Sequence, residues 1–233
     1  MKKKIVVFTG AGVSAESGIK TFRDSGGLWE EYDVRDVATP EAWAKNPGLV
    51  LRFYNERRNQ VIDAKPNAAH HAIASLQKKF DVHVVTQNID DLHERAGSKN
   101  VLHLHGEILK ARSSVDPALI YPMKNREIKI GDKCEKGSQL RPHIVWFGEA
   151  VPNYELGINI CHEAELLIII GTSLNVYPAA GIVHYAKPEV RKFLIDPQDI
   201  PHGSIENLTS IKEKAGTGMQ QLAERILSGE IVL

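Results

Sequence analysis

The chain has 233 residues, of which 42% are hydrophobic and 25% are charged, enough for one large domain or a main domain with a small insert. Its 29 lysines and arginines balance 29 aspartates and glutamates, so no overall field favours a nucleic acid or a membrane as partner. Two cysteines argue against a disulfide scaffold, and no apolar run approaches the roughly 18 residues of a membrane span, so we expect a cytoplasmic protein.

A buried strand followed by a glycine turn opens the chain. Residues 5–8 are apolar and mostly β-branched, which predicts a strand. Gly10 and Gly12 then let the backbone turn sharply and let a ligand approach its N–H groups, which would favour a pyrophosphate. Ser14 adds a hydroxyl, and Glu16 is either a first-turn acid or a hydroxyl acceptor. An ordinary strand-to-helix turn explains a lone G-x-G equally well.

Predicted helices and strands alternate along the rest of the chain. We expect five helices: one that begins after the cap Thr39, one over 49–63, one from 66 to about 79, one that ends at about Arg95, and one over 219–227. Strands are expected over 82–86, 101–105, 165–170 and 191–196, which are apolar and end at glycine, proline or polar residues. This alternation indicates an α/β fold with a doubly wound, Rossmann-like parallel sheet, whose ligand crevice lies at the carboxyl ends of the strands.

We interpret 1–233 as a single unit with two subsidiary parts. Residues 1–30, 80–106 and 142–233 would form the Rossmann-like part, and about 31–79 a helical small module. The stretch of about 107–141 has no long helix and breaks the alternation, which indicates a small inserted module.

A hydride-transferring Rossmann enzyme is disfavoured. The sixth position of its G-x-G-x-x-G pattern is Ala15 here, and the acid expected about 20 residues later at a strand end is missing. Three other strand-end loops, over 87–90, 105–107 and 171–173, carry groups able to bind a nucleotide. Asn88 can donate to and accept from a carboxamide, and Asp90 can accept from an amide nitrogen.

Five motifs in order, GAGVSAESGIKTFR, TQNIDDLHERAG, LHLHGE, RPHIVWFGE and GTSLNVYPAA, resemble those of the sirtuins, the NAD-dependent protein-lysine deacylases. The resemblance covers Lys4 to about Ala180. It implies that NAD is consumed as a co-substrate: the acyl oxygen of a modified lysine attacks the nicotinamide ribose, and the products are nicotinamide, free lysine and O-acyl-ADP-ribose. The implied general base is His105, since imidazole titrates near neutrality. On sequence alone His103, two residues earlier, is an alternative, and His70 is expected to be a packed helix residue.

The resemblance also implies two sets of binding residues. The NAD-binding set is Gly10, Ala11, Gly12, Ser14, Glu16, Phe22, Arg23, Gln87, Asn88, Ile89, Asp90, Gly171, Thr172, Ser173, Leu194, Ile195, Asp196 and Gly218. The residues implied to line the acyl-lysine tunnel and pair with the peptide are Trp146, Phe147, Gly148, Glu149 and Val151. The extended peptide should add as a strand between the two modules.

The nature of the acyl group is predicted by two residues of the expected helix over 49–63. Tyr54 and Arg57 are spaced i and i+3, so they share one face, and a phenol beside a guanidinium can hold a carboxylate. The pair, together with Ala15, resembles the subgroup that removes succinyl and malonyl groups. The alternative is a solvated helix face on which Glu56, Arg57 and Arg58 form surface pairs.

The chain departs from the family pattern at the zinc module and at the adenosine side. Most sirtuins hold zinc with two C-x-x-C pairs, but the matching positions here are Ser113, Asp116, Cys134 and Gly137. One thiolate cannot make such a site, so we predict no zinc. Packing of Ile120, Ile128, Ile130 and Leu140 would then hold the module together. Leu194 stands where the family usually has an asparagine near the adenosine ribose. Either Asp196 takes over the contact to that ribose, or the contact is lost. Residues 216–218 are expected to form the last adenine-side loop.

The preferred function is therefore a deacylase acting on acylated lysine proteins, with succinyl and malonyl groups preferred and acetyl also removed. The alternatives are a mono-ADP-ribosyltransferase, which uses the same ribose activation, and a non-catalytic protein that binds NAD and acyl-lysine. No nucleic acid or membrane partner is expected, and a monomer is.

Overall fold

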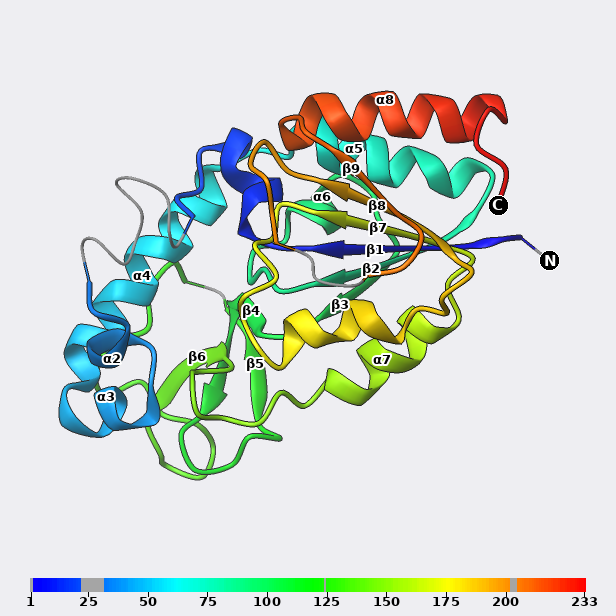
Figure 1. Cartoon of the computed structure of the whole chain (residues 1–233). Coiled ribbons are helices and arrows are strands. Elements are labelled where there is room, and N and C mark those ends of the chain that lie inside the picture. Colours follow the sequence, from blue (N-terminus) through cyan, green and yellow to red (C-terminus); the bar gives the residue numbers. More distant parts are fainter. Residues whose placement is uncertain (1, 22–31, 124, 202–204) are drawn as a thin grey trace.

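A parallel sheet forms the larger part of the molecule (Figure 1). The computed structural model describes residues 2–21, 32–123, 125–201 and 205–233. Within them the sheet has the order β3-β2-β1-β7-β8-β9, and every neighbouring pair is parallel. Its strands are β1 Lys4–Thr9, β2 Asp81–Thr86, β3 Asn100–His103, β7 Leu166–Ile170, β8 Arg191–Ile195 and β9 Leu208–Ile211. The predicted doubly wound α/β fold is confirmed.

Helices cover both faces of this sheet, which is why its central strands are continuously apolar. One face is covered by α5 (Ala68–Ser75), the short η2 (Leu76–Lys78) and α8 (Ala215–Ser228), and the other by α7 (Tyr154–His162) and η3 (Ala179–Tyr185) (Figure 1). Successive residues of β7 alternate between the two cores: Ile168 packs with the first set and Ile169 with the second. No helix in the described part of the chain combines the length and apolar character that crossing a bilayer requires.

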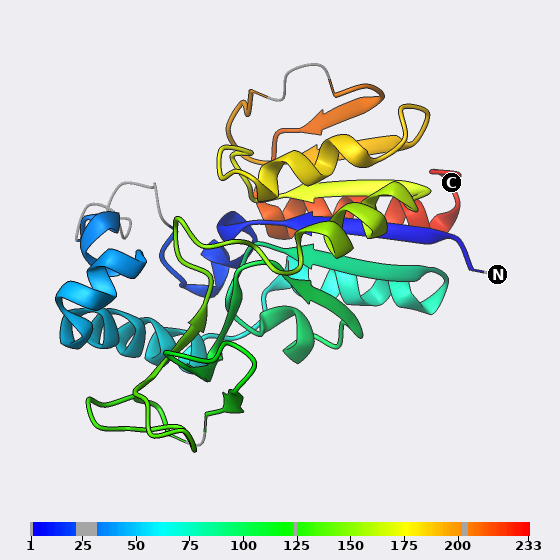
Figure 2. The ribbon, with the colours of Figure 1, turned by 90° about the horizontal axis from the view of Figure 1, so that it is seen from below.

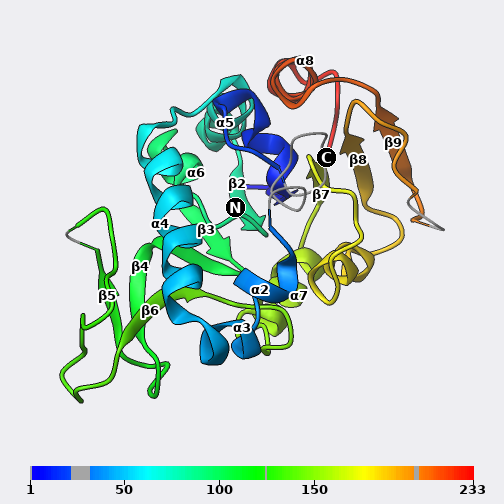
Figure 3. The same ribbon diagram turned by 90° about the vertical axis from the view of Figure 1, so that its left-hand side faces the viewer.

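The strand order reverses at β1, and this positions the site. From β1 the chain moves to β2 and β3 on one side, and then to β7, β8 and β9 on the other. The segments that follow β1 and β7 then continue on opposite faces of the sheet, with Val13 of η1 (Ala11–Ser17) in one core and η3 in the other. The carboxyl ends of these strands are therefore the expected ligand site. The short helices η1, after β1, and α6 (Leu92–Arg95), between β2 and β3, lie near this edge. Figure 3 views the molecule from that side, with α4 and the smaller sheet beside the carboxyl ends.

The small module combines three helices with an antiparallel sheet (Figure 2). The helices are α2 (Val34–Val37), α3 (Pro40–Lys45) and α4 (Pro47–Asp63), and the sheet has the order β5-β4-β6. Its strands are β4 Gly106–Ser113, β5 Ile120–Pro122 and β6 Leu140–Ile144. Thr39 caps α3 as predicted, because its hydroxyl accepts from the N–H of Ala42 at 3.0 Å.

Three sequence predictions are corrected by the packing. The predicted helical module over about 31–79 is too long, because α5 (68–75) packs on the parallel sheet with α8 instead. The third strand ends at His103 rather than at residue 105, because Gly106, with φ +83°, turns the chain into β4. Ile120 and Ile130 do not hold the inserted module, being 43% and 62% exposed. Ile128 does, at 2% exposed, with Leu140 packed against the same cluster.

Candidate active site

The glycine turn after β1 joins two loops at the strand-order reversal. Gly10 N donates to Ile170 O at 3.1 Å, and Gly12 N donates to Gly171 O at 2.8 Å. A Cβ on Gly12 would lie 2.7 Å from Gly171 Cα, and one on Gly171, whose φ is +64°, would lie 2.2 Å from Val13 N. Glycine is therefore needed at both positions for the loops to touch. The half-buried Ala11 begins η1, a 3₁₀ helix rather than a long α-helix.

A buried polar network lies behind this turn. Asn88 Nδ2 donates to Ser14 Oγ at 3.2 Å, and Ser14 Oγ donates to Asp90 Oδ2 at 3.0 Å. The other oxygen of Asp90 accepts from Leu92 N at 3.1 Å. Burial raises the pKa of Asp90, while the bonds from Leu92 N and Ser14 oppose that shift. The structure thus brings together Ser14, Asn88 and Asp90, which come from two motifs 74 residues or more apart.

His105 lies between the two sheets, on the short link from β3 to β4. Its Nδ1 lies 3.0 Å from Gln87 O and donates to it, so the neutral ring carries its lone pair on Nε2. Burial lowers the pKa of His105, and the bond to Gln87 O opposes this shift in part. The ring is therefore neutral at physiological pH, which is the state a proton acceptor requires. The backbone of His105 is fixed as well, since its carbonyl accepts from Val145 N at 3.0 Å.

The remaining residues of the strand-end loops connect to the same edge. Gln87 Nε2 donates to Thr172 Oγ1 at 3.0 Å, which bridges the loops after β2 and β7. Ser173 follows Thr172 and is half-buried. Ile89 packs against the core of the small module. Glu16 Oε2 accepts from Gly216 N at 2.7 Å. Its carboxylate therefore caps the N-terminal end of α8, 200 residues away, and does not act as a first-turn acid of its own helix.

The adenosine-side predictions fall on buried structure. Leu194 and Ile195 are 3% and 0% exposed and their side chains belong to the two sheet cores, so these side chains are not available to a cofactor. Gly218 is not in a loop but in the first turns of α8, where an added Cβ would lie 2.6 Å from Ile195 Cγ2. Asp196 is half-buried after β8, and its carboxylate accepts from Gln198 N at 2.9 Å.

Tyr54 and Arg57 lie on the buried face of α4, at 4% and 5% exposed. Their side chains pack beside Phe53: the two aromatic rings are 5.0 Å apart, and the guanidinium carbon lies 5.6 Å from the Phe53 ring centre. Burial raises the pKa of Tyr54 to about 12 and lowers that of Arg57 to about 10, so the phenol stays protonated and the guanidinium charged at neutral pH. The solvated-face alternative is wrong, because Arg58 is also buried and donates from Nε to Ile108 O at 2.8 Å.

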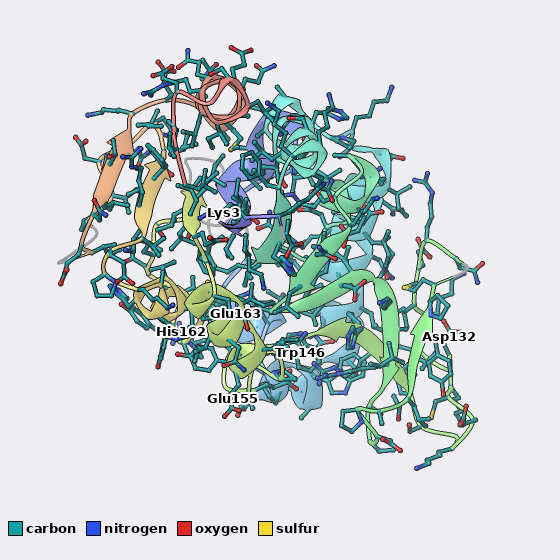
Figure 4. All side chains as sticks on the ribbon, turned by 90° about the vertical axis from the view of Figure 1, so that its right-hand side faces the viewer. Lys3, Asp132, Trp146, Glu155, His162 and Glu163 are labelled. Atoms are coloured by element: carbon teal, nitrogen blue, oxygen red, sulfur yellow. The ribbon has the colours of Figure 1, made fainter. Side chains whose placement is uncertain are left out.

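Trp146, predicted to line the acyl-lysine tunnel, is 2% exposed and belongs to the same core cluster as Tyr54. Trp146 is labelled in Figure 4, and it packs inside the small module with Ala42, Phe53 and Ile108. The guanidinium carbon of Arg141 lies 3.2 Å from its ring centre. Phe147 is 49% exposed, Gly148 has φ +89°, and Val151 packs beside η3 and α7.

Glu149 is part of an ion network that the sequence did not reveal. Its carboxylate accepts from Arg141 at 2.8 and 3.1 Å, from Arg112 at 3.0 and 3.1 Å, and from Trp146 N at 2.8 Å. Both of its oxygens are thus used inside the protein, where Glu149 holds Arg141 and the backbone of Trp146 in place. The contact of Arg141 with Trp146 could have been suspected from the sequence, because the arginine lies just before the aromatic residues of the motif RPHIVWFGE. Phe22 and Arg23, predicted to bind the cofactor, lie outside the described residues.

The positions that hold zinc in most members of the resembled family carry a hydroxyl cluster here. Cys134 Sγ lies 3.0 Å from Ser138 Oγ and 3.5 Å from Ser113 Oγ. Ser113 Oγ also accepts from the backbone N–H groups of Val115 and Asp116. A structural zinc takes four thiolate or imidazole ligands, so these donors do not fit it. Within the described residues no cluster of three or more His, Cys, Asp or Glu side chains is arranged for a metal. The absence of zinc stays a prediction.

Comparison with known proteins adds a family assignment to this geometry. Residues 10–178 match the Sir2 family. The chain is 49% identical over 230 residues to an NAD-dependent protein deacylase of Bacteroides thetaiotaomicron, covering 97% of this chain and 98% of that protein. It is 50% identical over 225 residues to an NAD-dependent protein deacylase of Helicobacter pylori strain 26695, with the same two coverages.

Solved structures agree with this match. A mutant Sir2 homologue in complex with ADP ribose superposes with a TM-score of 0.90 at 38% identity, covering 100% of this chain and 95% of that one. A Sir2 homologue in complex with NAD superposes with a TM-score of 0.87 at 38% identity, with coverages of 98% and 91%. A Sir2 protein bound to an acetylated peptide has a TM-score of 0.78 at 28% identity, with coverages of 98% and 94%.

Proposed function

The chain belongs to the Sir2 family and is an NAD-dependent protein deacylase, and from this premise we propose that it prefers lysines carrying succinyl or malonyl groups over acetylated lysines. The supporting observation is the pair of Tyr54 and Arg57 on the buried face of α4. The protonated phenol of Tyr54 and the guanidinium of Arg57 are each about 95% buried. Tyr54 belongs to the same core cluster as Trp146, and the guanidinium carbon lies 5.6 Å from the ring centre of Phe53 in that cluster. An acyl group that ends in a carboxylate is the ligand that such a pair fits.

The energetic argument favours an acidic acyl group over a neutral one. Burial disfavours the charge of Arg57, and the electrostatic effects of Tyr54 and Asp90 act in the opposite direction. A ligand carboxylate would add a charge-assisted hydrogen bond to this cation, and bonds of that kind contribute about 1.5–3 kcal/mol. An acetyl group offers no anion, so it gains nothing from Arg57.

For the cofactor side, we propose that Ser14, Asn88 and Asp90 hold the nicotinamide ribose of NAD. The glycine turn over residues 10–12 would contact its phosphates. The donors and acceptors of the three side chains converge at the carboxyl ends of β1 and β2, and the glycine turn lets a ligand approach the backbone. NAD, when bound, supplies the ribose carbon that is transferred to the acyl oxygen, with nicotinamide as leaving group. In this scheme His105 accepts a proton at Nε2, since its Nδ1 is committed to Gln87 O.

The peptide and the cell compartment complete the proposal. The segment from Phe147 to Val151 runs between the two modules and is the proposed pairing edge for an extended acyl-lysine peptide. Both cysteines, Cys134 and Cys161, are free and buried, which supports the expected cytoplasmic location. A monomer remains our expectation.

The test compares R57M with the parent on matched succinyl-lysine and acetyl-lysine peptides. Methionine keeps the bulk of the side chain but removes its charge, so we expect kcat/KM for the succinyl peptide to fall about ten- to hundredfold, with less than about a threefold change for the acetyl peptide. Y54F should produce a smaller loss of the same selectivity.

R52M is the matched control, because Arg52 lies on the exposed face of the same helix. It should leave both rates unchanged. An equal loss of both activities in R57M would contradict the assignment. Transfer of ADP-ribose to protein, in place of acyl-ADP-ribose and free lysine, would favour the mono-ADP-ribosyltransferase alternative.

A further inference from the structure

Two histidines of the HLH sequence before Gly106 hold neighbouring carbonyls of the loop after β2. His105 Nδ1 lies 3.0 Å from Gln87 O, and His103 Nδ1 lies 2.9 Å from Asn88 O. The other nitrogen of His103, Nε2, lies 2.7 Å from Glu94 Oε1. Asn88 is thereby held at its backbone by His103, while its side chain donates to Ser14.

The proton count at His103 is set by its partners. A carbonyl oxygen and a carboxylate oxygen both accept hydrogen bonds, so both ring nitrogens have to donate. A neutral imidazole has one N–H, and only the imidazolium has two. The ring is 8% exposed, so its charge is stabilised by contacts rather than by water. Burial opposes the charge, but the hydrogen bond and the charge of Glu94 outweigh it, and the pKa of His103 is raised.

Two histidines nearby have pKa values shifted in the opposite direction. His70 and His93 are fully buried with ring centres 4.8 Å apart, and burial lowers the pKa of both. The groups that act electrostatically on His103, or on which it acts, come from three elements. They are Glu94 and His93 on α6, Asp90 and Asp91 before it, and Glu107 on β4. Four of these five are acids, so they favour a cation at this place.

We propose that His103 and Glu94 form a positioning pair that couples the geometry of the 87–90 loop, and with it the affinity for NAD, to the protonation of His103. When the ring loses one proton, the remaining N–H stays with the carboxylate, which is the stronger acceptor. The lone pair on Nδ1 then faces Asn88 O, and the loop loses one anchor. The affinity for NAD falls as pH rises through the pKa of His103.

This inference rests on the proposed role of Asn88 and Asp90 in holding the cofactor and does not require the acyl preference. It concerns a residue that touches neither substrate in the proposal, so its effect is on binding rather than on the chemical step. Failure of the acyl preference would be seen with R57M and would leave it intact.

The experiment measures the dissociation constant for NAD by calorimetry, without peptide, between about pH 6 and 9.5, a range chosen to span a raised histidine pKa. For the parent we expect the constant to rise about fivefold across this range, the loss of one buried hydrogen bond. E94Q separates charge from contact: its amide can donate to Nε2 of a neutral ring that still donates from Nδ1 to Asn88 O. Its constant should match the parent's near pH 6 within about twofold and stay flat with pH.

D81N is the matched control, because His83 Nε2 lies 3.1 Å from Asp81 Oδ2 in a similar pair at the other end of β2. Its pH profile should match the parent's. H103A should weaken NAD binding about fivefold at all pH values while the melting temperature identifies any general loss of structure. A ¹⁵N-histidine spectrum at neutral pH should show one doubly protonated buried ring, missing in H103A. An E94Q profile parallel to the parent's, or unchanged binding in folded H103A, would overturn the proposal.

Discussion

Replacing Glu149 by glutamine tests whether the ion network behind Trp146 supports the substrate wall. The carboxylate accepts from two arginines and from Trp146 N, and the side chains of Arg141, Arg112 and Glu149 are 8%, 12% and 21% exposed. E149Q keeps the shape and one acceptor oxygen. It leaves two largely buried guanidinium groups without a counter-charge, and Arg141 is the one stacked on the Trp146 ring.

The expected cost follows from this burial. Breaking a buried pair by removing one partner costs about 3–5 kcal/mol, and the oxygen that glutamine retains reduces this to about 3 kcal/mol. Burial opposes ionisation of Glu149, but the bonds from Arg141 and Trp146 N and the charges of Arg141 and Arg112 outweigh it, so its pKa is lowered. Its contribution is therefore complete above the unfolded value of about 4.3 and is lost as pH falls through the folded pKa.

Urea unfolding followed by circular dichroism measures the effect. At about pH 7 E149Q should lose about 3 kcal/mol of unfolding free energy, and the difference from the parent should shrink below about pH 4. The KM for peptide should rise, because Trp146 loses its backing. The control is E230Q, whose carboxylate is 58% exposed and pairs with Arg225 on the surface, so a change below about 1 kcal/mol is expected. A loss in E149Q no larger than in E230Q would refute the argument.

Two further predictions concern the base and the metal. H105A should abolish release of free lysine while NAD still binds. With NAD saturating, the parent's kcat/KM for the peptide should fall below about pH 6.5, because the pKa of His105 is lowered and its neutral form is the base. An alanine variant as active as the parent would exclude this role. Metal analysis of the purified protein should find below about 0.1 zinc per chain, and EDTA should leave the melting temperature unchanged, since Cys134 is the one thiol of its cluster. Stoichiometric zinc would contradict the ligand argument.

The parallel sheet was predictable because its central strands are covered on both faces. Residues 5–8 and 166–170 read as unbroken apolar runs, and no competing pattern gives that signal. The small sheet was not predictable in this way. In β4, buried Ile108 and Ala111 alternate irregularly with half-buried charged residues, and a register shift lies between Gly106 and Ala111. The edge strand β9 is short and half polar, so it gives little signal either.

Charges inside the protein were the hardest feature to predict from sequence. Tyr54 and Arg57 could be placed on one helix face from their spacing, but not on the buried face, since arginine is rarely buried. Burial of Arg58 depends on Ile108 O, a carbonyl on β4 that lies 50 residues away in the chain. The hydrogen bond that Gly216 N donates to Glu16 and the pairing of Glu149 with Arg112 likewise join segments far apart in the chain, and local patterns carry no information about such partners.

In the proposed site, Asp90 lies between the acyl-binding Arg57 and the other residues that hold the cofactor, and interacts with both. It interacts electrostatically with Arg57 on α4 and with His103 on β3, so one buried carboxylate is stabilised by cations on two sides. A succinyl or malonyl carboxylate bound at Arg57 would be a second anion near Asp90. The two carboxylates would then share the stabilisation that the Arg57 charge provides. His103 must then carry more of the stabilisation of Asp90, which an imidazolium can do and a neutral ring cannot. An acidic acyl group and a protonated His103 therefore stabilise each other. For this reason the preference for acidic over neutral acyl groups should narrow as pH rises, even though Arg57 stays charged.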